Sequence, residues 1–284
     1  MTPFQTTLAI LIISIIISFF YGLFTRNYST VDRLWSILPG VYVLVWMQEF
    51  ANNPRFVIAS IIVIAWAIRL SLNFARRGGY NFNLKEGFTG EDYRWEIMRE
   101  KIPNRFIFEI FNLLFISTFQ LVLVFAITLP LYTVGQIQEP LDNIDYLLFG
   151  LHILFLTLET IADNQQYKYY AERDSVEFKD SPRHQLGFNT FGLWKYSRHP
   201  NYVCEMSQWV IVALYAFRLT GEIISFAGAA ILILLFMGST NLAEDITSQK
   251  YERYPEWRSS STAWITLPGI NIKKKKEFFR TLSE

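Results

Sequence analysis

Long uncharged stretches of apolar residues constrain this chain more than any other feature. The first stretch, Phe4 to Phe24, carries no charge, and 51% of all residues are hydrophobic. A run of about 20 apolar residues is long enough for a helix to cross the hydrocarbon core of a membrane. Because the start of the chain lacks the basic residues and the cleavage site of a signal peptide, we interpret this run as a retained transmembrane helix.

Further apolar runs of helical length follow along the chain. In lipid, a helix satisfies all of its own backbone polar groups. The predicted fold is therefore an all-α polytopic membrane bundle with about seven transmembrane helices. Pro39 and Gly40 interrupt the second run, and GEDYRWEIMREK (90–101) predicts a surface helix after a break at Gly90. The six further runs cover roughly 34–50, 55–75, 109–133, 144–166, 201–217 and 222–241.

The distribution of lysine and arginine predicts the orientation in the membrane. With the amino terminus outside, the inside segments hold 23 of the 26 Lys and Arg residues, while Arg55 and Arg218 are the basic residues of the outside segments. This asymmetry is typical of cytoplasmic loops. We therefore expect one transmembrane domain over 1–284 with a cytoplasmic cavity, and a cytoplasmic carboxyl-terminal segment over 245–284. The inside segments are 25–33, 76–105, 167–200 and 245–284.

Composition excludes several other classes of function. The net charge of +1 provides no basic field for nucleic acid. The three histidines and the single cysteine are scattered, so we expect no metal site. Glycine-rich nucleotide-binding motifs are missing from the sequence. The run Lys273–Lys276 either binds anionic membrane lipids or only retains the tail inside.

Polar residues recur on one face of several predicted helices. An ionisable group inside a membrane is costly unless it faces protein or water. Interhelical hydrogen bonds could explain each stripe singly, but most members fall in the cytoplasmic half of their helix, so we expect a wet polar cavity there. His152 lies nearer the outer half and is expected to be a buried structural residue. A helix turns by about 100° per residue, which places the members of each stripe on one face. The stripes are His152, Glu159, Asp163 and Gln166; Arg69, Asn73 and Arg76; Asn201, Glu205 and Gln208; and Asn241, Glu244, Asp245 and Ser248.

The segment 192–202, GLWKYSRHPNY, holds the densest set of polar and aromatic side chains. Pro200 suits the first turn of a helix, so the positive end of that helix would lie beside Lys195, Arg198 and His199. Such a helix start receives anions, phosphates in particular.

Aromatic residues of the same segment provide flat surfaces for a ring. These are Trp194, Tyr196 and Tyr202. A basic, aromatic membrane boundary would also produce this composition, but it leaves Asn201 and Glu205 unexplained.

The extended segment GLWKYSRHPNYVCE (192–205) resembles the steroid 5-alpha-reductase-like membrane family, in particular its bacterial branch. The resemblance implies a seven-helix bundle that binds NADPH from the cytoplasmic side and reduces a carbon–carbon double bond in a lipid. At Cys204 the chain departs from the family, which usually has glycine there. The resemblance continues in NYSTVDRLWS (27–36), RLSLNFARR (69–77), DNQQYKYY (163–170) and YERYPEWRSSSTAWITLP (251–268).

The resemblance also suggests which residues line the cofactor cavity. Arg69, Arg76 and Arg77 would lie nearby, and the stripes and the dense segment add Gln166, Trp194, Lys195 and Tyr196. The residues matched by the resemblance itself are Asp163, Arg198, His199, Asn201, Tyr202 and Glu205.

Reduction by NADPH makes two demands on the protein. Cations must hold the pyrophosphate and the 2′-phosphate, for which we consider Arg198, Lys195 and the arginines of 69–77. A donor must stabilise the enolate-like oxygen that develops on the substrate.

We assign the donor role to Asp32 or Tyr202, with Tyr28 as a further candidate. Asp32 would need a pKa raised by burial. Asp32 could equally cap the start of the second span or pair with Arg33. Glu49 is another possible donor, but the predicted topology places it at the outer end, away from the cofactor.

Two other functions are compatible with the sequence. Membrane methyltransferases of the isoprenylcysteine type have a similar R-H-P-x-Y segment and use S-adenosylmethionine, which needs no extra arginines. A transporter or scaffold would place its polar residues at the midplane, whereas here they gather at one side. We therefore expect an NADPH-dependent oxidoreductase whose substrate is a hydrophobic lipid such as a steroid, polyprenol or enone.

Overall fold

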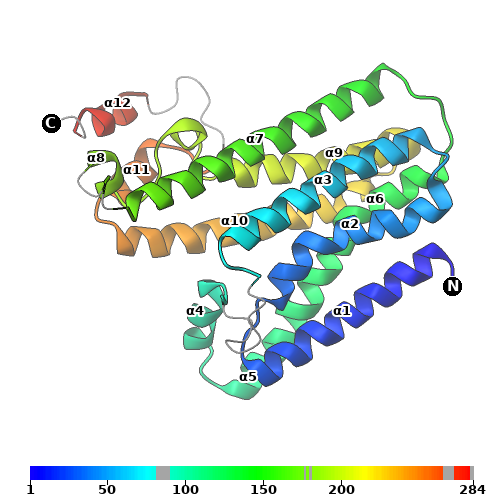
Figure 1. Cartoon of the computed structure of the whole chain (residues 1–284), viewed down its shortest axis with the longest axis horizontal. Coiled ribbons are helices and arrows are strands. Elements are labelled where there is room, and N and C mark those ends of the chain that lie inside the picture. Colours follow the sequence, from blue (N-terminus) through cyan, green and yellow to red (C-terminus); the bar gives the residue numbers. More distant parts are fainter. Residues whose placement is uncertain (81–89, 176, 179–180, 265–271, 282–284) are drawn as a thin grey trace. The chain divides into compact units, whose positions relative to one another are not determined.

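The computed structural model describes residues 1–80, 90–175, 177–178, 181–264 and 272–281, and the regular elements in these ranges are helical. This confirms the all-α prediction. The chain divides into two compact units, each described separately below. Figure 1 traces the helices along the chain. Unit 1 comprises Met1–Gly150 and Trp209–Ala230, and unit 2 comprises Leu151–Gln208 and Ile231–Glu284.

Five helical segments are long and apolar enough to cross a membrane, which confirms a multi-pass membrane protein. The third combines α5 (Arg105–Phe111), a π-helix η1 (Asn112–Phe119) and α6 (Gln120–Gln136), and the fifth begins with η3 (Ile223–Phe226) and continues as α10 (Ala227–Lys250). The other three are α1 (Pro3–Thr25), α3 (Pro54–Arg76) and α7 (Asn143–Arg173).

Two further helices coincide with predicted apolar runs. They are α2 (Thr30–Phe50) and α9 (Pro200–Thr220), each 21 residues long. Helix α2 continues through Pro39, which is buried inside it. The residue after it, Gly40, allows a close approach to α3, because an added Cβ would lie 3.1 Å from Ala67 Cβ. The interruption expected in this run is therefore a packing contact within one continuous helix.

In unit 1, α2 packs against α1, α3 and α6 (Figure 1). Tyr42 and Trp46 of α2 are completely buried. The indole Nε1 of Trp46 donates to Thr7 Oγ1 of α1 at 3.2 Å. The Tyr132 ring of α6 lies 5.3 Å from the ring of Trp46. Aromatic packing around α2 thus forms the core of this unit.

One end of unit 1 is closed by a buried ion pair. Arg55 Nε, at the start of α3, lies 2.7 Å from Asp145 Oδ1 at the start of α7, and both side chains have no exposed surface. Arg218, near the end of α9, also binds Asp145. At the same end Asn53 Nδ2 donates to the Val134 carbonyl of α6 at 2.9 Å.

The opposite end of unit 1 is built around the α1–α2 connection. Tyr28 donates its hydroxyl to Glu109 of α5 at 2.7 Å, and Arg33 Nε donates to the Gly79 carbonyl after α3 at 2.9 Å. Here α4 (Tyr93–Lys101) is the helix predicted after Gly90. Its Trp95 is buried. The start of α2 therefore lies at this end of unit 1, and its end lies beside Asn53 at the other end.

Unit 2 contains the rest of α7, the start of α9, and α10 from Ile231 onward. A small hydrophobic core, given below, joins α8 (Pro182–Gln185), α11 (Tyr254–Ser260) and α12 (Ile272–Arg280). The four-lysine run lies in α12, where Lys273, Lys274 and Lys276 are exposed. The core residues are Leu186, Phe188, Tyr254, Trp257 and Phe278.

Candidate functional site

The dense segment (192–202) runs from η2 (Gly192–Lys195) into the first turn of α9 in unit 2. Pro200 is the first residue of α9, as its sequence position predicts. The backbone N–H groups of Arg198 and His199 donate to the carbonyls of Thr262 and Ala263, each at 3.1 Å. These bonds fix the segment against the stretch that follows α11.

A single buried carboxylate, Glu244 of α10, binds three basic side chains. Arg198 donates from Nε at 2.7 Å and from Nη2 at 3.1 Å. His199 Nε2 and Arg258 Nε each lie 3.0 Å from this carboxylate. Glu244 is only 2% exposed, so its charge is compensated by these partners. We call Glu244, Arg198, His199 and Arg258 the Glu244 cluster.

The Arg198 guanidinium uses its remaining donor on the backbone. Its Nη1 donates to the Arg258 carbonyl at 2.9 Å and to the Ser261 carbonyl. All three guanidinium nitrogens therefore bind protein atoms. In this geometry Arg198 holds the segment to α10 and α11.

Two amide side chains, one half-buried and one buried, connect α9 to α7. Asn201 Nδ2 lies 3.2 Å from Asp163 Oδ1, and Gln208 Nε2 lies 2.7 Å from Glu159 Oε2. Both carboxylates are buried, at 3% and 2% exposure. These contacts set the orientation of the two amides, because only the nitrogen of an amide can donate to a carboxylate.

The side-chain oxygens of these two amides, and that of Gln166 in α7, are buried hydrogen-bond acceptors. Asn201 Oδ1, Gln208 Oε1 and Gln166 Oε1 have no hydrogen-bond partner among the described residues. Buried polar atoms in folded proteins nearly always have partners. We call these atoms the amide acceptors, and their chemistry suits a ligand or water that brings N–H or O–H groups.

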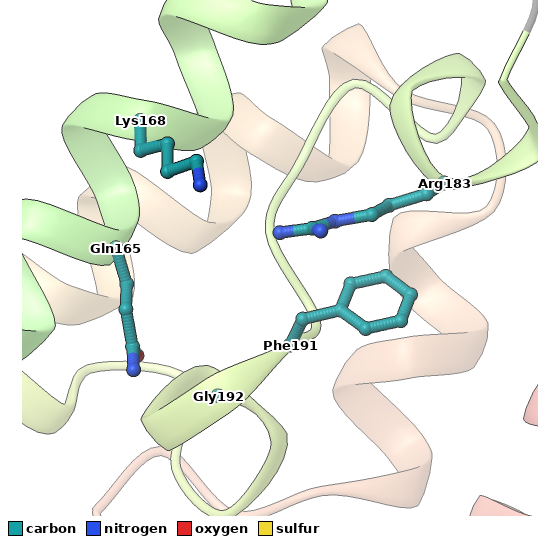
Figure 2. Close-up of a pocket in the computed structure, with 5 residues that line it drawn as sticks. All are labelled: Gln165, Lys168, Arg183, Phe191 and Gly192. Carbon is teal, nitrogen blue, oxygen red and sulfur yellow. The ribbon is translucent and has the colours of Figure 1, made fainter.

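A cavity of about 290 Å³ lies next to the dense segment. Figure 2 shows Lys168 of α7 facing Arg183 of α8 across it, with Gln165 below Lys168. Gln165 Oε1 accepts the Leu193 N–H at 2.8 Å. Gly192 makes this possible, because a Cβ there would come within 2.3 Å of that oxygen. We refer to this cavity, lined by Gln165, Lys168, Arg183, Phe191 and Gly192, as the donor pocket.

The aromatic and basic residues predicted in the dense segment have different surroundings. Trp194 is buried and donates its indole N–H to the Ala162 carbonyl of α7 at 2.9 Å, which anchors η2. Tyr196 is 61% exposed. Lys195 Nζ lies 5.4 Å from the Phe279 ring centre. The Tyr202 ring stacks on His199 at 5.3 Å between centroids.

The other predicted residues belong to unit 1. Arg69 and Arg76 lie in α3 and Arg77 follows it, with Arg76 Nε donating to Asn73 at 2.9 Å. Asp32 lies in the first turn of α2, before the span expected at 34–50.

Two residues of unit 1 contact the Asp32 carboxylate. Trp95 Nε1 donates to it at 3.0 Å, and Arg94 Nη2 lies 3.7 Å away. Burial raises the pKa of Asp32 above its usual range, although the positive charge of Arg94 acts in the opposite direction. A raised pKa is the property that the proposed donor role requires.

Among the predicted residues, unit 2 brings Asp163 to Asn201 and brings Arg198, His199 and Tyr202 together. Glu205 is buried on the same helix as Asn201, and His152 is buried, as predicted. Gln208 lies on a stripe predicted to face the polar cavity, but it was not among the predicted cofactor residues, and neither were the residues that line the donor pocket. Gln165 stands beside Gln166 in DNQQ (163–166), which was the available signal.

Comparison with known proteins assigns the chain to a family. Residues 18–262 match a family model described as a protein of unknown function, DUF1295. The chain is 30% identical over 268 residues to the uncharacterized protein C594.04c of Schizosaccharomyces pombe, covering 86% of this chain and 76% of that relative. No solved structure gives a significant match. With helices able to cross a membrane several times and a family match over most of its length, this multi-pass membrane protein belongs to the DUF1295 family.

Proposed function

We propose that this protein is a membrane oxidoreductase that uses NADPH to reduce a carbon–carbon double bond in a hydrophobic lipid. The proposal combines the resemblance of residues 192–205 to the steroid 5-alpha-reductase-like family with one observation in the structure. That observation is the set of amide acceptors that α7 and α9 hold beside Asp163 in unit 2.

The amide acceptors fit the polar groups of a dinucleotide. A nicotinamide carboxamide offers an NH₂ group and each ribose offers hydroxyl groups, which are the donors that Asn201 Oδ1 and Gln208 Oε1 lack among the described residues. A purely structural amide would have both ends bonded, because an unmade buried hydrogen bond costs about 1–3 kcal/mol. A ligand that restores these bonds would bind with selectivity for its donors.

In this proposal Arg198 is a positioning residue. Its guanidinium is bonded to Glu244 and to two carbonyls, so it orders the segment that carries Asn201. Lys195 stays a candidate for a phosphate contact, because its side chain is exposed. The stacked His199 and Tyr202 rings form a flat surface at the start of α9.

Bound NADPH would supply the hydride. The protein would supply a proton donor for the developing substrate oxygen, and Tyr202 and Asp32 are our two candidates. The raised pKa of Asp32 keeps its carboxyl protonated to higher pH than an ordinary aspartate, which is how a carboxylic acid becomes a hydrogen-bond donor.

We further propose seven membrane crossings, with the amino terminus outside and the carboxyl terminus in the cytoplasm. The contacts at the two ends of unit 1 support α2 as a crossing helix, because they place the start and the end of α2 at opposite ends of the unit. Arg55 and Arg218, the two basic residues predicted to lie outside, both bind Asp145. This supports their location on the same side of the membrane.

The proposal is tested by ligand-dependent stability of the detergent-purified protein. We expect NADPH to raise the unfolding temperature, because a ligand at 100 times its Kd stabilises the native state by about 2.7 kcal/mol. Asn201→Ala should weaken this response, whereas Asn52→Ala, at an exposed position between α2 and α3, should leave it unchanged. Stabilisation by S-adenosylmethionine alone would replace the reductase with a methyltransferase.

A second measurement addresses the reaction itself. NADPH consumption should depend on an added lipid enone and should fall in Asn201→Ala. NADPH binding without any lipid-dependent consumption across steroid, polyprenol and long-chain enones would contradict a reductase of these substrates.

A further inference from the structure

The donor pocket combines polar groups of a single kind. Lys168 contributes an ammonium group and Arg183 a guanidinium group, neither of which can accept a hydrogen bond. Gln165 Oε1 is already bonded to the Leu193 N–H, so its amide nitrogen is the group that can still donate. The described residues that line the pocket include no carboxylate. Side chains that offer donors and positive charge are complementary to an anion.

The Arg183 side chain is held in a defined orientation. Its guanidinium carbon lies 4.4 Å from the centre of the Phe191 ring, and Figure 2 shows the group extending over that ring toward the hollow. Arg183 Nε is buried and has no hydrogen-bond partner among the described residues. Stacking leaves the edge of a guanidinium, with its fork of N–H groups, available to a phosphate or carboxylate.

The described residues around the pocket carry a net positive charge. Lys168 Nζ lies 3.6 Å from Glu172 Oε1, but the Lys168 side chain is 75% exposed, so this ion pair is weak. Glu172 also contacts His184 at 3.2 Å. Among the described residues, Lys168 and Arg183 contribute two positive charges against the one negative charge of Glu172. A phosphate monoester carries a charge of about −1.5 to −2 at neutral pH. It therefore matches two cationic side chains more closely than a carboxylate, which carries a single negative charge.

We propose that the donor pocket binds a phosphate group of a ligand, held by Lys168, Arg183 and the Gln165 amide. The cavity of about 290 Å³ leaves room beside the phosphate for part of the molecule that carries it. The phosphate belongs either to a nucleotide or to an anionic lipid headgroup. This site is independent of the reductase proposal, because it follows from the lining residues alone.

The test measures phosphate binding to the purified full chain in two arms. The first arm titrates adenosine 2′-monophosphate, with adenosine as the uncharged comparison, in neutral detergent. The second arm reconstitutes the protein in phosphatidylcholine discs with and without phosphatidic acid and measures retained lipid. Preference in the first arm identifies a nucleotide phosphate, and preference in the second identifies a lipid phosphate.

Variants locate the binding in the pocket. We expect Lys168→Gln and Arg183→Gln each to weaken binding of the preferred probe about tenfold, as loss of one charge-assisted hydrogen bond predicts. Lys101→Gln, an exposed lysine at the end of α4, serves as the matched control and should bind like the unmodified protein. Arg183→Lys keeps the positive charge but loses the stacked guanidinium fork. Its affinity for the probe should therefore lie between that of Arg183→Gln and that of the unmodified protein.

Two results would overturn the proposal. One is equal binding of either probe by the Lys168→Gln, Arg183→Gln double variant and by the unmodified protein. The other is no phosphate-dependent binding in either arm by a protein whose unfolding temperature shows that it is folded. NADPH-dependent reduction is measured separately, so failure of the phosphate site and failure of the reductase activity give different results.

Discussion

At the residue scale, the most consequential side chain is Glu244, because three basic groups depend on its charge. Glu244→Gln keeps the size and removes the charge, which leaves buried Arg198 without its counter-ion. Breaking a buried ion pair costs about 3–5 kcal/mol, so we expect a large fall in unfolding temperature in detergent. We also expect weaker ordering of residues 197–201, measured by hydrogen exchange.

The neighbouring residue Asp245 is the control for this prediction. Asp245 is 61% exposed and pairs with Arg258 at 2.8 Å. A surface pair of this kind contributes about 1 kcal/mol at most, so Asp245→Asn should change the unfolding temperature little. Equal losses from Asp245→Asn and Glu244→Gln would show that the Glu244 cluster does not hold the segment.

Asp32 allows a prediction on pH. Its pKa in the folded protein is above the unfolded value, so the native state binds more protons between the two pKa values and stability decreases as pH rises through that window. Asp32→Asn removes this titration. The unfolding temperature of Asp32→Asn relative to the unmodified protein should therefore increase as the pH is raised from about 4. A constant difference across this range would mean that folding does not raise the pKa of this carboxyl.

The residues that the sequence identified are those that a helical repeat aligns. Asp163 and Asn201 lie on predicted stripes, and the structure joins them. The partners of Arg198 could not be predicted in the same way, because Glu244 is 46 residues away in sequence. An arginine near a helix start suggests a phosphate contact equally well whether or not a distant carboxylate already binds it.

At the element scale, α12 is a short basic helix whose position depends on one aromatic side chain. Phe278 is 4% exposed, and its ring lies 5.2 Å from that of Trp257 in α11. Phe278→Ala would remove a buried ring, which costs about 3–5 kcal/mol where the site cannot collapse. We expect α12 to detach, with faster hydrogen exchange in both α11 and α12.

An exposed residue of the same helix provides the comparison. Glu277 is exposed, so Glu277→Ala should leave the exchange of α11 unchanged. Unchanged exchange in Phe278→Ala would show that Lys275, whose amine lies 5.4 Å from the Trp257 ring centre, is enough to hold α12.

The long helices were predictable because each is an apolar run, and runs of this kind have few alternatives in lipid. The π-helix η1 was not predicted, since its residues are as apolar as their neighbours. A side-chain contact gives a physical reason for it. Ser117 Oγ donates to Asn112 Oδ1 at 3.2 Å, five residues apart, which is the spacing of a π-helical turn.

At the scale of the whole molecule, the number of crossings decides which side each loop faces. Hydropathy alone selects five segments, and it omits α2 and α9, the two helices with much of the candidate chemistry. The contacts within unit 1 favour counting both. Asp145 joins the start of α3, the start of α7 and the end of α9, as expected if α9 runs antiparallel to α7 through the same membrane.

Cysteine labelling can decide between these counts, because the single native cysteine, Cys204, is buried. With seven crossings, cysteines placed at the exposed positions Asn52 and Glu222 should react with an impermeant reagent added outside. Cysteines at Lys101 and Glu277 should react only after the membrane is opened. If α2 stayed on the inside, α3 would carry Lys101 outside. If α9 failed to cross, Glu222 would lie inside and Glu277 outside. Failure of α2 to cross and failure of α9 to cross therefore give different labelling patterns. Only seven crossings place both the dense segment and the basic tail in the cytoplasm.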